Sequence, residues 1–324
     1  MAKVDKSIMK LITKAEQGDA DAQSSLGLIY ENGRGAEQSD EKAFEWYQKA
    51  ADQGDAGSQC RIGVMYATGH GTRRIYKKAI EWLTKAAGQG CAEAQYNLGL
   101  LFTEGHGVSR SFRKAAGWFS KASVNGHVDA QYRLGELFTE GLGVRRNRAE
   151  AVRLYKSAAT KGHAGAKRNL GNMYSRGWGV DKNDKKAVEW YMKAAEQGDS
   201  DAQYLLGLCY EFGTGVTQDG EKAVEWYMKA ADQEHIRAQF RLATAYYEGK
   251  LIEQDYEKAY EGYLKGADLG DPDTYYLLGL MHENGEGVEE DFEKAIEWYE
   301  RAADYGDCNA IERLTDIGIY THED

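Results

Sequence analysis

The sequence predicts an all-α fold, an α/α solenoid of eight helix-turn-helix repeats of 36 residues each. The first observation behind this prediction is that the chain aligns with itself at a shift of 36 residues without an insertion, as Gln23, Gln59 and Gln95 illustrate. The second is that apolar residues within each repeat return at the 3.6-residue spacing of an α-helix. The third is a helix-forming composition rich in Ala, Glu, Lys and Leu, with one proline in 324 residues.

The first helix of each repeat is predicted from a stripe of apolar residues. In the first repeat, Ala22, Leu26 and Tyr30 lie on one helical face because they are spaced four residues apart. A glycine follows the repeated leucine in seven repeats, at Gly27, Gly63, Gly99, Gly135, Gly171, Gly207 and Gly279. Glycine inside a helix costs about 1 kcal/mol relative to alanine. Its return therefore predicts a neighbouring helix that approaches too closely for a Cβ atom.

The second helix of each repeat alternates large and small apolar residues. Ala43, Trp46, Tyr47 and Ala50 share one face, and the pattern returns through most of the chain. A Gly-x-Gly turn, such as residues 105–107, joins the two helices, because glycine permits the positive φ that ends a helix. These turns are not phosphate loops, since no Lys-Ser/Thr follows them and no strand precedes them.

Neighbouring repeats are expected to stack and share one continuous core, because a single helix pair cannot bury its own apolar face. We expect an N-terminal capping helix within residues 1–18, eight helix pairs over 19–306 and a C-terminal capping helix within 307–324. The uniform composition argues against an ordinary two-domain split. The seventh repeat departs from the pattern at Glu234, Ala243 and Gly262, so we expect the stack to bend differently there.

Several motifs in these repeats resemble the Sel-one-like repeat (SLR) family, relatives of the tetratricopeptide repeats. They are Ala94-Gln95-Tyr96-Asn97-Leu98-Gly99, Gly105-His106-Gly107-Val108, Lys186-Ala187-Val188-Glu189-Trp190-Tyr191 and Lys193-Ala194-Ala195-Glu196-Gln197-Gly198. The resemblance covers nearly the whole chain and implies a right-handed superhelix whose first helices line the concave side. It also implies a non-enzymatic bacterial adaptor or scaffold that binds a partner protein or peptide on that side.

An alternative function comes from the cysteine-rich bacterial branch of the same family, which carries a disulfide in each repeat. That branch suggests a hydrolase or a protein that binds cell-wall carbohydrate. The four cysteines of this chain form no repeated pairs: Cys60, Cys91, Cys209 and Cys308. We therefore do not carry that activity over, and we keep it as the alternative to a scaffold.

Variable positions on the first helices are the candidate partner-binding residues. They follow the repeated glutamine by two and by five residues, so they are i and i+3 on a face distinct from the core stripe. The candidates are Arg61, Asn97, Arg133, Glu136, Asn169, Asn172, Leu205 and Arg241. Polar residues at the centre with apolar residues on the flanks suit a peptide groove. The competing interpretation is that these positions vary because nothing constrains them.

The net charge of −11 hides a strong asymmetry along the chain. Residues 105–180 contain fourteen Lys and Arg against four Asp and Glu, whereas residues 181–324 contain fourteen against thirty-four. Arg145, Arg146 and Arg148 form a basic patch between two predicted helices. This patch favours an acidic protein partner, which includes the acidic half of a second copy and hence self-association. The alternative is that the patch is a solvated surface without a partner. Nucleic acid is disfavoured as a partner because the net negative charge of the protein repels a polyanion.

No catalytic, metal or cofactor site is predicted. Equivalent histidines such as His70 and His106 occupy the same turn position in stacked repeats, whose helices lie roughly 8–10 Å apart. A shared metal needs each nitrogen within about 2.1 Å, so such a pair cannot readily bind one ion. The cysteines are expected to be free thiols in a reducing compartment, which predicts a cytoplasmic protein. The first twenty residues contain no signal-peptide core and no run of residues suits a membrane span, so no membrane partner is expected.

Overall fold

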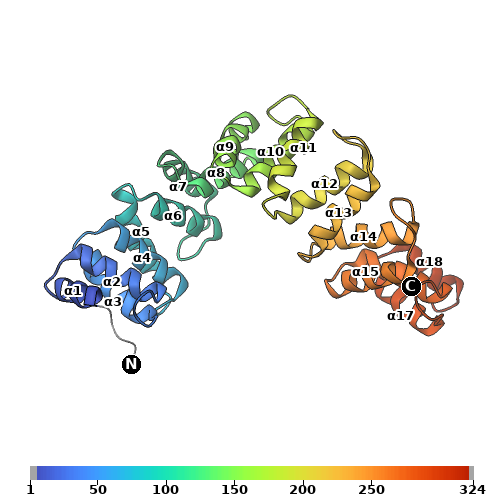
Figure 1. Cartoon of the computed structure of the whole chain (residues 1–324), viewed down its shortest axis with the longest axis horizontal. Coiled ribbons are helices and arrows are strands. Elements are labelled where there is room, and N and C mark those ends of the chain that lie inside the picture. The colour runs from blue at the N-terminus through green and yellow to red at the C-terminus, as the bar shows by residue number, and fades with distance from the viewer. Residues whose placement is uncertain (1–5, 321–324) are drawn as a thin grey trace. The chain divides into compact units, whose positions relative to one another are not determined.

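The computed structural model describes residues 6–320, which form eighteen α-helices and one short 3₁₀ turn (Figure 1). The first helices of the repeats are α2 (Ala20–Asn32), α4 (Ala56–Thr68), α6 (Ala92–Glu104), α8 (Val128–Glu140), α10 (Ala164–Arg176), α12 (Ser200–Phe212), α14 (Ile236–Glu248) and α16 (Tyr275–Asn284). The second helices are α3 (Asp40–Asp52), α5 (Tyr76–Gly88), α7 (Phe112–Val124), α9 (Arg148–Thr160), α11 (Asp184–Ala195), α13 (Gly220–Ala231), α15 (Tyr256–Asp268) and α17 (Phe292–Asp304). The predicted all-α array of eight helix pairs is confirmed.

The two end segments each contain one helix. These are α1 (Lys6–Glu16) and α18 (Cys308–Asp316), while residues 1–5 and 321–324 of the predicted capping segments lie outside the described residues. In α1, Ile8 and Ala15 are buried against Ala22 and Leu26 of α2. This contact covers the apolar face that the first repeat would otherwise leave open.

Contacts divide the chain into two compact units, residues 1–163 and 164–324. The division falls between the fourth and fifth repeats, so unit 1 contains α1 to α9 and unit 2 contains α10 to α18. Each unit thus holds four helix pairs and one end helix. The sequence shows no linker at this point, which is why the division was not predicted.

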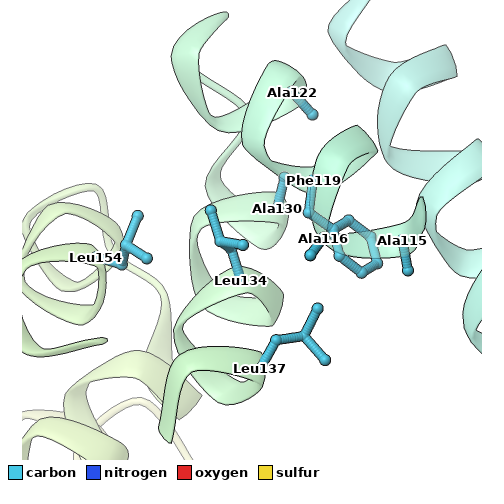
Figure 2. Close-up of a cluster of buried hydrophobic side chains, with 8 residues drawn as sticks. All are labelled: Ala115, Ala116, Phe119, Ala122, Ala130, Leu134, Leu137 and Leu154. Carbon is cyan, nitrogen blue, oxygen red and sulfur yellow. The ribbon is translucent and has the colours of Figure 1, made fainter. Parts of the chain in front are cut away.

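Neighbouring repeats share their core, as predicted. Figure 2 shows one cluster in which the alanines of α7 and the ring of Phe119 face leucines of the next repeat. Its buried members are Ala115, Ala116, Phe119, Ala122, Ala130, Leu134, Leu137 and Leu154, from α7, α8 and α9. Because the cluster draws on two repeats, neither repeat could bury it alone.

The repeated glycine of the first helix is explained by close packing within the repeat. A Cβ atom on Gly99 would lie 2.3 Å from Cε1 of Phe119, and one on Gly207 would lie 2.4 Å from Cε1 of Tyr227. In all seven repeats the nearest atom belongs to the buried side chain at the same position of the second helix, 2.3 to 2.7 Å away. The predicted close approach is confirmed, and it offsets the conformational cost of glycine.

The repeated glutamine ties three helices together. Gln59 is buried, and its Nε2 donates to the carbonyl oxygen of Ala51 at 3.1 Å, in the preceding helix. Its Oε1 accepts from Nε2 of Gln89 at 2.9 Å, in the turn after the next helix. Gln95 and Gln203 repeat both bonds with their own neighbours. Satisfied at both ends, the buried amide fixes the spacing between repeats without an unpaired polar group.

The seventh repeat keeps its packing by exchanging large and small residues. Ala243 stands where the other seven repeats have glycine, and Gly262 of α15 stands where six of them have tryptophan. A Cβ on Gly262 would lie 2.8 Å from Cβ of Ala243, so the small residue has moved to the opposite helix. Glu234 takes the place of the closing glycine with a positive φ of 58°. The different bend expected here stays a prediction.

Candidate partner-binding face

Three of the predicted residues line one hollow in unit 2. Asn169 and Asn172 of α10 and Leu205 of α12 border a space of about 630 Å³. Its other walls come from the same first helices, from the turn that joins α13 to α14 and from the start of α14: Arg168, Arg176, Ser200, Asp201, Tyr204, Gln233, Glu234, His235, Ile236 and Arg237. We call this space the α10–α14 hollow. The variable positions of two successive first helices therefore face a common space, and their use as a peptide groove stays a prediction.

Asn172 is held in a fixed orientation inside the α10–α14 hollow. The hydroxyl of Tyr191, a buried residue of α11, donates to Oδ1 of Asn172 at 2.8 Å. Burial raises the pKa of Tyr191, so this hydroxyl stays a donor at physiological pH. Because Oδ1 is occupied, the Nδ2 group of Asn172 remains as the end that can donate to a bound molecule.

One wall of the hollow carries a charged cluster centred on Asp201. Nη1 of Arg168 lies 3.1 Å from Oδ1 of Asp199 and also pairs with Asp201. Nε2 of His235 lies 3.1 Å from Oδ1 of Asp201, and its ring stacks on Tyr204 with centroids 5.0 Å apart. These pairs hold α10, α12 and the start of α14 in register and give the wall its shape.

Two further arginines of the hollow are exposed. The guanidinium of Arg176 lies over the ring of Trp178, 4.6 Å from its centroid, and Arg237 lies in the first turn of α14. Stacking on an aromatic ring leaves the edge of a guanidinium available for hydrogen bonds. Both groups can therefore meet a carboxylate of a bound partner.

The predicted residues of unit 1 line two smaller hollows. Arg133 and Glu136 of α8 border a space of about 310 Å³ beside Leu100, Phe112 and Leu142. These two side chains form an ion pair with 3.1 Å between Nη1 of Arg133 and Oε2 of Glu136. Asn97 borders a space of about 200 Å³ between α4 and α6, and its Nδ2 donates to the carbonyl oxygen of Glu93 at 2.9 Å.

Arg61 and Arg241 have a structural role that sequence reasoning missed. Arg61 lies 3.3 Å from Oε1 of Glu31, and the other oxygen of that carboxylate accepts from the hydroxyl of Tyr47 at 2.6 Å. The same arrangement joins Arg241, Glu211 and Tyr227, and again Arg313, Glu283 and Tyr299. We call these inter-repeat bridges. The signal in the sequence is an arginine 30 residues after a glutamate, on the first helix of the next repeat.

The predicted basic patch lies on a turn and not on the first-helix face. Arg145 and Arg146 are exposed in the connection between α8 and α9, and Arg148 is the half-buried first residue of α9. Nη2 of Arg146 donates to the carbonyl oxygen of Glu140 at 3.3 Å. Because Glu140 also lines the 310 Å³ hollow, the patch adjoins that hollow at its edge.

Two histidines that directly precede first helices, His127 before α8 and His235 before α14, serve as helix caps. Nδ1 of His127 accepts from the backbone N–H of Ala130 at 3.2 Å, and the ring stacks on Tyr96 with centroids 4.4 Å apart. Across residues 6–320, no group of three or more His, Cys, Asp and Glu residues lies close enough together to hold a metal ion. In the same part of the chain, no helix is long and apolar enough to cross a membrane.

A sequence profile of the Sel1 repeat matches eight consecutive stretches: residues 20–55, 56–91, 92–127, 128–163, 164–199, 200–235, 236–271 and 272–307. The crystal structure of c5321, a protective antigen present in uropathogenic Escherichia coli strains displaying an SLR fold, is 37% identical, with a TM-score of 0.86. The match covers 96% of this chain and 67% of that one. A Sel1 repeat protein from Oxalobacter formigenes is 33% identical with a TM-score of 0.74, covering 97% of this chain and 90% of its own. A comparison of the sequence with curated proteins gives no match.

Proposed function

The chain belongs to the Sel1 repeat family, and we propose that it is a non-enzymatic scaffold that binds a partner protein or peptide on its first-helix face. Proteins of this family generally mediate protein–protein interactions. The observation that carries the proposal is the convergence of Asn169, Asn172 and Leu205 on the α10–α14 hollow.

An extended peptide with acidic side chains fits the chemistry of this hollow. The Nδ2 group of Asn172 is oriented to donate to a backbone carbonyl oxygen, and Leu205 and Ile236 offer apolar contact. Arg176 and Arg237 supply positive charge at the rim, where it steers association more than it adds affinity. A volume of about 630 Å³ lies within the range of protein ligand sites, which is roughly 300–1,000 Å³.

The proposal extends to the basic patch and to the compartment. Arg145, Arg146 and Arg148 offer a second contact for an acidic protein, which includes the acidic half of another copy. Free thiols at all four cysteines support a reducing, cytoplasmic location. They lend no support to the alternative of a hydrolase or carbohydrate-binding protein like the cysteine-rich relatives.

Selection of peptides from a random displayed library on the immobilised full chain tests the proposal. The test variant is Asn169→Ala with Asn172→Ala, and the control is Glu189→Ala with Glu225→Ala on the exposed sides of α11 and α13. Two lost hydrogen bonds of about 1 kcal/mol each predict roughly thirtyfold weaker binding of the selected peptides to the test variant. Peptides that bind wild type and test variant equally would contradict the assignment of the hollow.

A further inference from the structure

Cys60 and Cys91 occupy two positions of the repeat at which side chains meet. Cys60 lies in α4, Cys91 directly precedes α6, and the two are 31 residues apart. Pairs with the same spacing and the same positions are in contact in four other repeats. They are Tyr96 with His127, Tyr132 with His163, Tyr204 with His235, and Arg168 with Asp199. The fold therefore brings the two thiols of unit 1 together.

The surroundings of the two thiols differ. Cys60 is 4% exposed in an apolar cluster with Leu83 and Leu98, whereas Cys91 is half-buried and packs against that cluster. A hydrogen-bonding interaction between the two thiols, aided by the backbone N–H groups of Ala94 and Glu93, lowers the pKa of Cys91 to about 6. The same interaction and burial raise the pKa of Cys60. Cys91 is thus the accessible thiolate and Cys60 the protected thiol beside it.

We propose that Cys60 and Cys91 are a redox modification site that forms a reversible disulfide by exchange with a small-molecule disulfide such as oxidised glutathione. The thiolate of Cys91 attacks one sulfur of the reagent, forms a mixed disulfide and releases the first thiolate. Cys60 then gives its proton to solvent and attacks the sulfur of Cys91, which breaks the mixed disulfide and releases the second thiolate. Two protein thiols are oxidised, and the reagent is reduced to two thiols.

The disulfide would join the first helices of the second and third repeats. Its loop encloses the whole of α5, and α4 and α6 are the helices whose side chains line the 200 Å³ hollow beside Asn97. Oxidation would therefore fix the spacing between the two walls of that hollow. Cys209 and Cys308 stand at other positions of their repeats, where neither shares this arrangement.

The site is tested on the reduced full chain incubated with oxidised glutathione, denatured, alkylated and analysed by peptide mass spectrometry. We expect two alkylated cysteines in place of four, one linked peptide pair containing Cys60 and Cys91, and full reversal by dithiothreitol. A loop of this length predicts a thermal midpoint about 5 to 10 °C higher for unit 1 after oxidation. Cys308→Ser should leave all of these results unchanged.

Cys91→Asp is the matched variant that loses the disulfide, and it is expected to fold because Asp19, Asp55 and Asp199 cap other first helices. Cys60→Ser is the second variant, since the first repeat has Ser24 at that position. Three outcomes would overturn the proposal: a stable glutathione adduct on Cys91 without the link, a link to another cysteine, or four free thiols after oxidation.

Discussion

Replacement of the packed helix glycine by alanine tests the physical basis of the repeat. In Gly99→Ala, the new Cβ would lie 2.3 Å from Cε1 and 2.5 Å from Cδ1 of Phe119. Carbon atoms in contact are normally about 3.5–4.0 Å apart, and Phe119 is 1% exposed within the cluster of Figure 2. Overpacking of this kind lowers the free energy of unfolding by about 1–3 kcal/mol. The higher helix propensity of alanine raises it by about 1 kcal/mol. The difference between these two terms predicts a net loss of stability of up to about 2 kcal/mol.

Gly117→Ala is the matched control in the same repeat. Gly117 lies in the middle of α7, is exposed, and has no atom within 4 Å of an added Cβ. Helix propensity alone predicts a gain of about 1 kcal/mol there. Urea unfolding followed by circular dichroism compares the two variants, with an unchanged dependence on urea as the check that the denatured state is the same. Equal stabilisation by both substitutions would refute the packing argument.

Three further predictions concern charge and protonation. Glu211→Ala removes the acceptor of the buried Tyr227 hydroxyl and the partner of Arg241. The free energy of unfolding should therefore fall by about 1–3 kcal/mol. Glu221→Ala, at an exposed position, is the control, and an equal effect of both substitutions would show that the inter-repeat bridge does not stabilise the fold. Burial lowers the pKa of His282, and the nearby Lys294 adds to the effect. The unfolded chain therefore binds the proton more strongly than the folded chain. The free energy of unfolding should fall as pH drops below about 6.5, by at most about 1.4 kcal/mol per pH unit. His282→Phe, which introduces the residue that Phe102 and Phe138 place at the same repeat position, should flatten that slope in denaturation series at pH 7.5 and about 5.5; an unchanged slope would show that another group is responsible. Reversal of Arg145, Arg146 and Arg148 to Glu should slow association with an acidic partner and weaken the salt dependence of that association, while helicity is kept. Light scattering at low and high salt tests self-association. Unchanged partner capture by the triple variant would show that the patch is a solvated surface.

The helix pairs and their packing were predictable because the repeat supplies the same information eight times. Period, apolar stripe and internal glycine each have one physical interpretation, and they predicted the close approach of a helix at Gly99. They did not identify Phe119 as the side chain that lies there. Some residues of the α10–α14 hollow could also be identified from the sequence. Asn169 and Asn172 were found as variable positions on a face apart from the core, and the structure places them in one space.

Contacts between repeats were not predictable from periodicity alone. Arg61 and Arg241 look like surface charges, since their partners Glu31 and Glu211 lie 30 residues earlier. In the sequence, Ala243 and Gly262 are two separate departures from the repeat pattern. The structure shows that they are in contact and that one compensates for the other. In each case the missing information is which side chains face one another, and a repeat pattern by itself does not contain it.

The central claim is that a partner lies on the first-helix face, and side-chain amide signals in nuclear magnetic resonance test it most directly. A selected peptide is titrated into ¹⁵N-labelled full chain, and the NH₂ groups of Asn169 and Asn172 are followed. We predict that both signals shift together with the amides of α10, α12 and the start of α14. Shifts confined to the second helices α11 and α13, with both asparagine signals unmoved, would contradict the claim.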